Sequence, residues 1–147
     1  MTIFGYPDYK ITMRAEAQLF KALGDETRLK ILWLLMSQGE LCVTEIKGVL
    51  DITQSRASRH LQTLSHAGLV AGRRERFCVY YRISADSGTG KGKLLEVLRE
   101  MLAGQPFAED LREWFQRWFD LGKEEATANI RKKARELAEL GKKLGIS

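Results

Sequence analysis

The sequence predicts a mainly α-helical fold with a small β-wing, a winged helix-turn-helix followed by extra C-terminal helices. Residues 41–66 read as a short helix, a three-residue turn and a second helix. Two strand-like runs come next, and an arginine-rich bend joins them. Apolar residues at helical spacing lie on both sides of this stretch. Together these features are typical of a protein that places one helix and a hairpin against DNA.

Two helices are expected before the motif. Apolar residues at helical spacing predict the first over 12–23, with Thr12 as its cap and Gly24 at its end. Asp25 is a good N-cap for the second helix, because its carboxylate can accept from the first free backbone amides. The polar run 37–39 ends that helix.

The motif itself begins with a β-prone piece, Glu40 to Val43. Thr44 is expected to cap the third helix, and Thr53 the fourth, which covers residues 54–66. Gly68 closes the fourth helix, because glycine readily adopts the left-handed conformation found after a helix end.

The wing is predicted from two β-prone runs, 69–73 and 77–83, the second with alternating faces. The bend between them contains Arg74, Glu75 and Arg76 but no Gly, Asn or Pro. A two-residue primed turn normally requires one of these residue types. We therefore expect a longer or looser wing tip.

After the wing, residues 84–93 have the composition of a flexible linker. A fifth helix is expected at 94–103, and it is apolar on nearly every side. Such a short helix buries two sides only if something besides its own domain covers it, so the pattern favours a subunit interface.

Two more helices are expected, at about 107–121 and 123–140. The chain then divides into a DNA-binding and dimerisation domain, 1–103, and a helical extension, 104–147, packed on the domain or on the dimer. The first of the two helices carries an aromatic and apolar stripe. Its members are Phe107, Leu111, Trp114, Phe115, Trp118 and Phe119.

Composition narrows the function. The chain of 147 residues has 44% hydrophobic and 29% charged residues, as an ordinary globular domain does. No apolar run approaches the roughly 18 residues that cross a membrane, and the first ten residues lack a signal-peptide pattern. We expect a cytoplasmic protein. With no Gly-rich phosphate loop and no Ser/His/Asp set, an enzyme is not expected, nor is a cofactor.

The net charge of +5 is concentrated in one place. Residues 54–82 hold six arginines and one acid, Glu75, so the rest of the chain balances to zero. Within the fourth helix, Ala57, Leu61 and Leu64 define the buried side on a helical wheel. The opposite face and the wing give the candidate DNA-binding residues. These are Gln54, Ser55, Arg56, Ser58, Arg59, Gln62, Arg73, Arg74 and Arg76.

Four segments, 22–32, 40–46, 53–70 and 73–83, together resemble the ArsR/SmtB family of bacterial winged-helix repressors. The resemblance covers about residues 14–103. It implies a homodimer built on the first and fifth helices, bound to double-stranded DNA at an inverted-repeat operator. It also implies release from that operator when an inducer, here unknown, binds.

The family's metal sites do not carry over to these residues. Arsenic- and cadmium-type sensors in the family resemble ELCVCDL, with thiolates that would fall at Cys42, Thr44 and Lys47. One thiolate does not hold a soft metal ion by itself. Zinc-type sensors use histidines on the fifth helix, where this chain has only Glu96 and Glu100 as comparable groups. No metal site of either kind is expected.

Three interpretations of the switch stay open. Cys42 lies in a piece that usually pairs with the second wing strand, where Cys78 lies, so the two thiols are candidates for a redox- or metalloid-responsive switch. The alternative is that both are buried cysteines that act only as small hydrophobic side chains. Alternatively, the aromatic residues after position 106 line a pocket for an apolar ligand. A different function altogether is a winged-helix module that binds a protein, which the arginine-rich wing disfavours.

Overall fold

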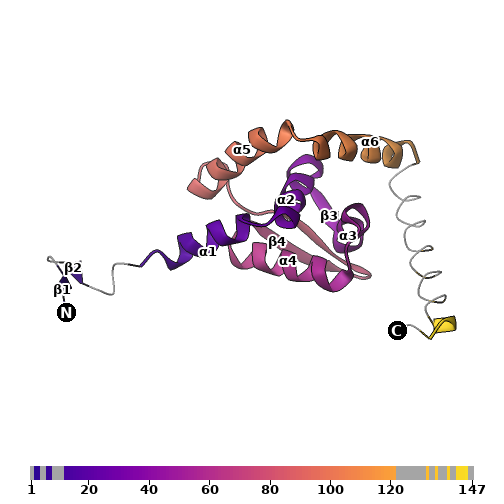
Figure 1. The fold of residues 1–147 in the computed structure, drawn as a ribbon, viewed down its shortest axis with the longest axis horizontal. Coiled ribbons are helices and arrows are strands. Elements are labelled where there is room, and N and C mark those ends of the chain that lie inside the picture. Colours follow the sequence, from indigo (N-terminus) through magenta and orange to yellow (C-terminus); the bar gives the residue numbers. More distant parts are fainter. Residues whose placement is uncertain are drawn as a thin grey trace.

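Helices form the body of the molecule, and a three-stranded sheet lies behind them in the view of Figure 1. The computed structural model describes residues 2–3, 6–7, 12–121, 132, 135, 139 and 142–145. Within these residues no helix combines the length and apolar character that crossing a membrane requires. The expected helix over 123–140 falls almost wholly outside the described part.

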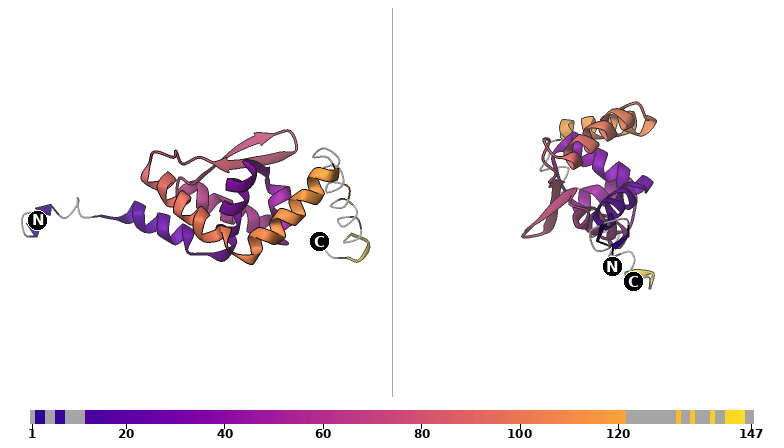
Figure 2. Two further views of the ribbon diagram at one scale, coloured as in Figure 1. Left: turned by 90° about the horizontal axis from the view of Figure 1, so that it is seen from above. Right: turned by 90° about the vertical axis from the view of Figure 1, so that its left-hand side faces the viewer.

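The described elements occur in the following order: β1 (Thr2–Ile3), β2 (Tyr6–Pro7), α1 (Arg14–Leu23), α2 (Glu26–Gln38), β3 (Glu40–Cys42), α3 (Val43–Leu50), α4 (Gln54–His66), β4 (Val70–Glu75), β5 (Cys78–Ile83), α5 (Gly90–Ala103) and α6 (Pro106–Leu121). β1 pairs with β2, and the larger sheet has the antiparallel order β3-β5-β4. Figure 2 shows the β4–β5 hairpin projecting from the helical body. The winged helix-turn-helix expected from the sequence is confirmed.

The core is centred on α2, which lies between α4 on one side and α5 and α6 on the other (Figure 1). The largest fully buried side chains of the core all come from residues 31–69, which hold α2 and the helix-turn-helix. They are Ile31, Leu32, Leu34, Leu35, Leu41, Ile46, Leu61, Leu64 and Leu69. Each such burial stabilises the fold by about 1.5–3 kcal/mol relative to an exposed side chain.

The predicted caps of the second and fourth helices are confirmed. The Asp25 carboxylate accepts from the Arg28 amide at 3.0 Å, and the Thr53 hydroxyl accepts from the Arg56 amide at 3.2 Å. Gly68 follows α4 with φ +75°, as expected for the residue after a helix. These short-range contacts fix where the two helices begin and end.

The other two predicted caps differ from the structure. α1 begins at Arg14 with Met13 as N-cap, although the Arg14 amide still reaches the Thr12 hydroxyl at 3.4 Å. The prediction that Thr44 caps α3 is wrong, because Cys42 is the N-cap. Strand β3 runs straight into α3, so pairing with β5 sets the start of this helix and no hydroxyl cap is used.

The predicted linker over 84–93 is too long, because α5 already begins at Gly90. The Thr89 hydroxyl accepts from the Gly92 amide at 3.2 Å and donates to the Asp86 carbonyl at 2.6 Å. Gly92 is buried against that same carbonyl. The glycines that suggested flexibility therefore allow close packing, and Thr89 supplies the cap.

Helix α6 begins at Pro106, which fits the first helical position because its missing N–H has no partner there anyway. The helix expected at about 107–121 therefore begins one residue earlier than predicted. Ala108 and Leu111 are buried, and Phe107 and Trp114 pack partly against the core. The side chains at 115–121, which include the rest of the aromatic stripe, lie outside the described set.

Candidate nucleic-acid interface

Helix α4 presents a polar face opposite its buried side. Ala57, Leu61 and Leu64 are fully buried, as the helical wheel predicted. On the other side, Ser58 is half-buried and the remaining candidate residues are exposed. The exposed candidates are Gln54, Ser55, Arg56, Arg59 and Gln62. No Asp or Glu occurs in the helix, so nothing on it repels a phosphate backbone.

The turn that sets α4 relative to α3 depends on one strained residue. Asp51 follows α3 with φ 53° and ψ 50°, a left-handed conformation that Asp tolerates better than most residues. The next amide, of Ile52, returns to the Lys47 carbonyl at 3.2 Å. Thr53 then begins α4 in an extended conformation, which gives the sharp change of direction between the two helices.

The wing tip is tighter than the sequence predicted. Strands β4 and β5 pair as far as Glu75 opposite Cys78, which leaves only Arg76 and Phe77 in the connection. Neither residue has a positive φ, so the turn is not of the primed type. The expected longer tip is wrong because the strand ladder continues to the end of the hairpin and holds the short turn together.

The three wing arginines have different surroundings. Arg74 and Arg76 are exposed. Arg73 instead forms ion pairs with Glu40 and Glu75, with its Nε donating to Glu40 Oε1 at 3.0 Å. These two carboxylates, Glu40 first, raise the pKa of the Arg73 guanidinium. Its positive charge is therefore already balanced within the wing, which sequence spacing did not reveal.

A hollow of about 460 Å³ lies between the start of α4 and the wing. It brings together two groups of predicted site residues, the helix start and the wing tip. Its lining consists of Val43, Thr44, Gln54, Arg74, Glu75, Arg76, Phe77, Cys78 and Val79. The helix and the hairpin thus share one concave surface with more positive than negative side chains.

The two cysteines form a disulfide, with Cα atoms 6.0 Å apart. The predicted pairing of the Cys42 segment with the second wing strand is confirmed, since Cys42 lies opposite Tyr80 in the β3–β5 ladder. Cys42 is buried, whereas Cys78 is half-buried. The bond ties the start of α3 to the wing strand β5.

A network that the sequence did not suggest connects three helices. Arg28 of α2 donates through Nε to the Ala22 carbonyl at 2.7 Å and through Nη2 to the Lys21 carbonyl at 3.1 Å. Its Nη1 lies 3.3 Å from Nδ1 of His60 on α4. One guanidinium therefore joins the end of α1 to the candidate recognition helix.

His60 titrates under the influence of this network. Burial lowers the pKa of His60, and the nearby guanidiniums of Arg28, Arg56 and Arg59 add to that effect. The Asp25 carboxylate, 4.0 Å from Nδ1, acts in the opposite direction. The His60 side chain itself is half-buried. An unprotonated Nδ1 is also what allows His60 to accept from Arg28.

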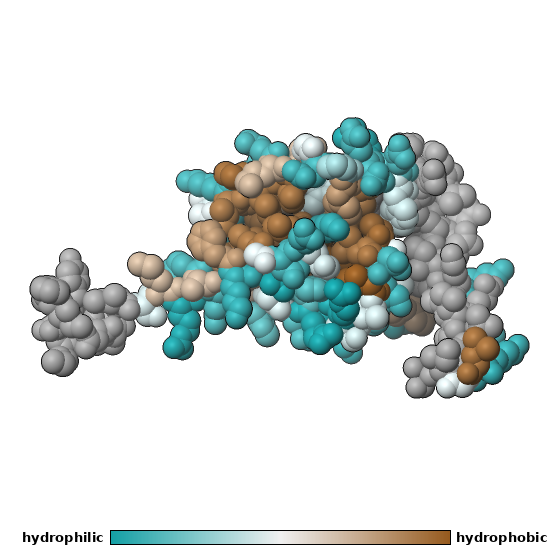
Figure 3. All heavy atoms as spheres, in the orientation of Figure 1, coloured by the Kyte–Doolittle hydropathy of each residue, from teal (hydrophilic) through white to brown (hydrophobic). Residues whose placement is uncertain are grey.

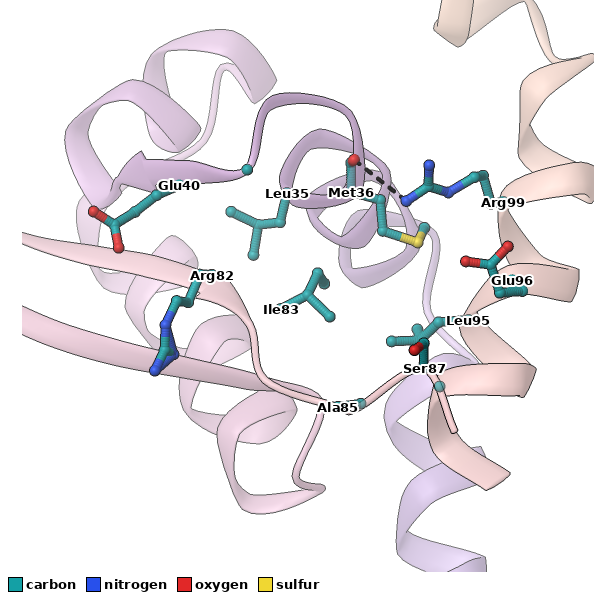
Figure 4. A pocket seen from close by; sticks show the side chains of 12 residues that line it. Leu35, Met36, Glu40, Arg82, Ile83, Ala85, Ser87, Leu95, Glu96 and Arg99 are labelled. Atoms are coloured by element: carbon teal, nitrogen blue, oxygen red, sulfur yellow. Dashed lines mark hydrogen bonds between the residues drawn. The ribbon is translucent and has the colours of Figure 1, made fainter. Parts of the chain in front are cut away.

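A second hollow lies among the end of α2, β5 and α5 (Figure 4). Figure 4 shows Leu35, Ile83 and Leu95 inside it. At its rim Arg99 donates to the Met36 carbonyl at 3.5 Å. This contact joins α5 to the carboxyl end of α2, so the hollow is bridged by the protein's own side chain.

The described residues contain no group of three or more His, Cys, Asp or Glu side chains arranged to hold a metal ion.

Comparison with known proteins gives a consistent assignment for the helix-turn-helix motif. A family model described as "Bacterial regulatory protein, arsR family" matches residues 25–71. This range contains α2, α3 and α4, which are the helices that build and present the polar face.

Curated relatives share the same region. The chain is 43% identical over 79 residues to the arsenical resistance operon repressor of Escherichia coli strain K12, covering 54% of this chain and 68% of that protein. It is 40% identical over 67 residues to a cadmium resistance transcriptional regulatory protein CadC homologue of Staphylococcus aureus. That match covers 46% of this chain and only 55% of the relative.

A solved structure has the same architecture. It is the homodimeric winged helix-turn-helix DNA-binding domain Mb0332 of Mycobacterium bovis, a possible ArsR-family transcriptional regulator. The two are 32% identical with a TM-score of 0.58, and the match covers 71% of this chain and 94% of that domain. The likeness therefore extends over the helices and the wing together.

Proposed function

The chain belongs to the arsR family of bacterial regulatory proteins, and from that premise we propose that it is a homodimeric repressor that an inducer releases from an inverted-repeat operator. It is a DNA-binding transcription regulator of the winged helix-turn-helix kind and not an enzyme. The proposal includes a cytoplasmic location, where such a regulator meets its DNA.

The DNA-binding face of the proposal consists of α4 and the wing. The observation that carries it is the exposed, acid-free face of α4 beside the exposed Arg74 and Arg76. Gln and Arg on α4 are suited to adenine and guanine edges in a major groove, and wing arginines to phosphates. Arg73 keeps a place in the contact set, with a smaller contribution because Glu40 and Glu75 already neutralise it.

The dimer of the proposal uses the outer faces of α1 and α5. Large apolar side chains are exposed on these two helices, Phe20 (61%), Val97 (53%) and Met101 (66%), and at Met13 (75%), the N-cap of α1. In Figure 3 hydrophobic residues gather on the face between α1 and α5. A second copy covering this face would shield it from water and would also place two α4 helices for two half-sites. The extension 104–147 is proposed to pack on this assembly.

Arg59→Ala combined with Gln62→Ala tests the DNA face. We expect DNA affinity for the chain's own promoter to fall by about 1–3 kcal/mol for each base that the protein no longer touches, while the dimer stays intact. Fluorescence anisotropy with a labelled promoter fragment measures the affinity, and sedimentation measures the dimer. Arg112→Ala is the matched control, because Arg112 is an exposed arginine on α6, outside α4 and the wing. Unchanged affinity in the double variant would contradict the proposed docking.

Salt dependence separates this function from a protein-interaction module. Phosphate contacts release counterions, so the logarithm of DNA affinity should fall steeply and linearly with the logarithm of salt concentration. A complex with a protein partner that is insensitive to salt, together with no promoter binding, would favour the module instead.

A second candidate concerns the inducer, and the Cys42–Cys78 disulfide favours it. We propose that the oxidised protein binds the operator less tightly than the dithiol form, because the bond fixes the wing against the start of α3. Promoter binding by oxidised and reduced protein should therefore differ, and the difference should disappear in Cys42→Ser with Cys78→Ser. Equal affinities of the two forms would leave the inducer to be sought elsewhere.

A further inference from the structure

We propose that the Cys42–Cys78 disulfide is opened by a small thiol that attacks Cys78 through the hollow between α4 and the wing, a route that bound DNA closes. The proposal rests on the DNA-binding face proposed above. It assigns different chemical roles to the two sulfurs, and it makes the reduction of the protein depend on whether DNA occupies that face.

Access distinguishes the two sulfurs. Cys78 lines the hollow, and its Sγ lies 3.7 Å from the Thr44 hydroxyl at the same surface. Cys42 is only 4% exposed, is absent from that lining, and contributes to the hydrophobic core. A thiolate must reach one sulfur from the side opposite the leaving sulfur. Of the two cysteines only Cys78 lines the hollow, so it is the one that a thiolate entering there meets.

Charge at the hollow favours an anionic attacker. Arg74 and Arg76 line it with one opposing acid, Glu75. At the leaving sulfur the local charges oppose one another, because Cys42 caps α3, whose N-terminal amides stabilise a thiolate, while Glu45 lies in the same first turn. The position of Cys78 in the hollow and the positive charge there therefore decide which sulfur is attacked. The stability of the Cys42 thiolate as leaving group does not decide it.

The reaction is an ordinary thiol–disulfide exchange. A glutathione thiolate forms a bond to Cys78 Sγ, the Cys42–Cys78 bond breaks, and Cys42 leaves as the thiolate. A second glutathione thiolate attacks the glutathione sulfur of the mixed disulfide and releases the Cys78 thiolate. In total one protein disulfide is reduced and two glutathione molecules are oxidised to their disulfide.

The DNA-binding face covers this entry. Gln54, Arg74 and Arg76 line the hollow and are also proposed DNA contacts. A duplex seated on α4 and the wing would lie over the mouth of the hollow. Bound DNA would thus protect the disulfide from reduction, and the protein would change redox state mainly when it is off DNA.

The first test identifies the attacked sulfur in the wild-type protein. Oxidised protein is treated with glutathione in the presence of iodoacetamide, which traps the released thiolate, and the peptides are analysed by mass spectrometry. We expect glutathione on Cys78 and the alkyl group on Cys42. The reverse pattern, or an even mixture, would overturn the proposal while leaving DNA binding untouched.

Single-cysteine variants give an independent measurement. In Cys42→Ser the remaining Cys78 should react with an aromatic disulfide reagent at least several-fold faster than the remaining Cys42 does in Cys78→Ser. Adding Arg74→Gln and Arg76→Gln should slow the reaction of the Cys78 thiolate with anionic glutathione disulfide, in which one glutathione is transferred to Cys78 and the other leaves as its thiolate, whereas Arg112→Gln on α6 should not. Equal rates for the two cysteines would overturn the assignment.

The last arm uses a 30-base-pair duplex at low salt, with binding followed by anisotropy in the same solution. The rate of reduction by glutathione should fall in proportion to the bound fraction, and high salt that releases the DNA should bring the rate to that of DNA-free protein at the same salt concentration. A bound duplex that leaves the rate unchanged would overturn the route. If no duplex binds to either redox form, the proposed function fails. The first test, which locates glutathione on Cys78 or Cys42, does not depend on that result.

Discussion

Arg28 shows how much a single side chain decides in this fold. It caps the end of α1 by donating to the Lys21 and Ala22 carbonyls, and it reaches His60 on α4. Removing it would leave two helix-end carbonyls without that donor and would separate α4 from α1. Burial lowers the pKa of the histidine that it contacts.

Stability should depend on pH through His60. Its pKa is lowered in the folded protein from an ordinary value of 6.5, so below pH 6.5 the unfolded chain binds more protons than the folded one. Stability should therefore fall as the pH drops from 6.5 towards the lowered pKa and then level off. Urea unfolding between pH 7.5 and 5 measures this.

His60→Gln is the matched control, because glutamine does not titrate but still offers Arg28 an acceptor. The decline below pH 6.5 should be much smaller in this variant. A further decline at more acidic pH should remain in both proteins, because the Arg28 amide lowers the pKa of Asp25 below 3.8 and that stabilisation disappears on protonation. An identical decline above pH 5 in both proteins would contradict the role of His60.

At the scale of elements, α5 shows that the same residues suit a linker or a helix start. Composition alone assigned Gly90 and Gly92 to a flexible segment, but both lie in the first turn of α5. The Thr89 cap and the approach of Gly92 to the Asp86 backbone fix that turn. The two glycines nevertheless have different surroundings, which makes a direct comparison possible.

Gly92→Ala should destabilise the protein, and Gly90→Ala should not. A Cβ at Gly92 would lie 2.0 Å from the Asp86 carbonyl oxygen, so the backbone must shift, at a cost of about 1–3 kcal/mol. A Cβ at Gly90 meets nothing within 4 Å, and alanine there should stabilise α5 by about 0.5–1 kcal/mol. Thermal unfolding compares the two variants, and equal stabilities would be inconsistent with this packing.

At the scale of the whole molecule, the apolar faces of α1 and α5 and the polar face of α4 together support a dimer that binds DNA. A lone subunit exposes Phe20 and Met101 to water, and a pair of subunits would bury them. Pairing also doubles the DNA-binding surface, so the two interfaces are energetically linked in the proposed dimer.

Phe20→Glu with Met101→Glu should convert the protein to monomers, because carboxylates resist burial against an apolar face. Sedimentation should show the change of mass, and promoter affinity should fall by at least an order of magnitude because a monomer reaches only one half-site. Phe77→Ser, at another exposed phenylalanine, on the wing tip, should leave the mass unchanged. A double variant that stays dimeric would place the interface elsewhere.

Sequence by itself determined the winged helix-turn-helix, the Asp25 and Thr53 caps, and the buried side of α4. Each of these depends on residues within about one or two helical turns, where periodicity and capping act directly. The pairing of a β-prone segment with the second wing strand also followed from the order of the elements.

Tertiary structure decided which distant side chains meet, including the choice between the two alternatives that the sequence left open for Cys42 and Cys78. Cys42 and Cys78 are 36 residues apart, Glu40 and Arg73 are 33 apart, and Arg28 and His60 are 32 apart. Strand register selects the first two pairs, and the packing of α2 against α4 selects the third. Local sequence patterns contain no information about such register and packing, because these are set by the whole buried core at once.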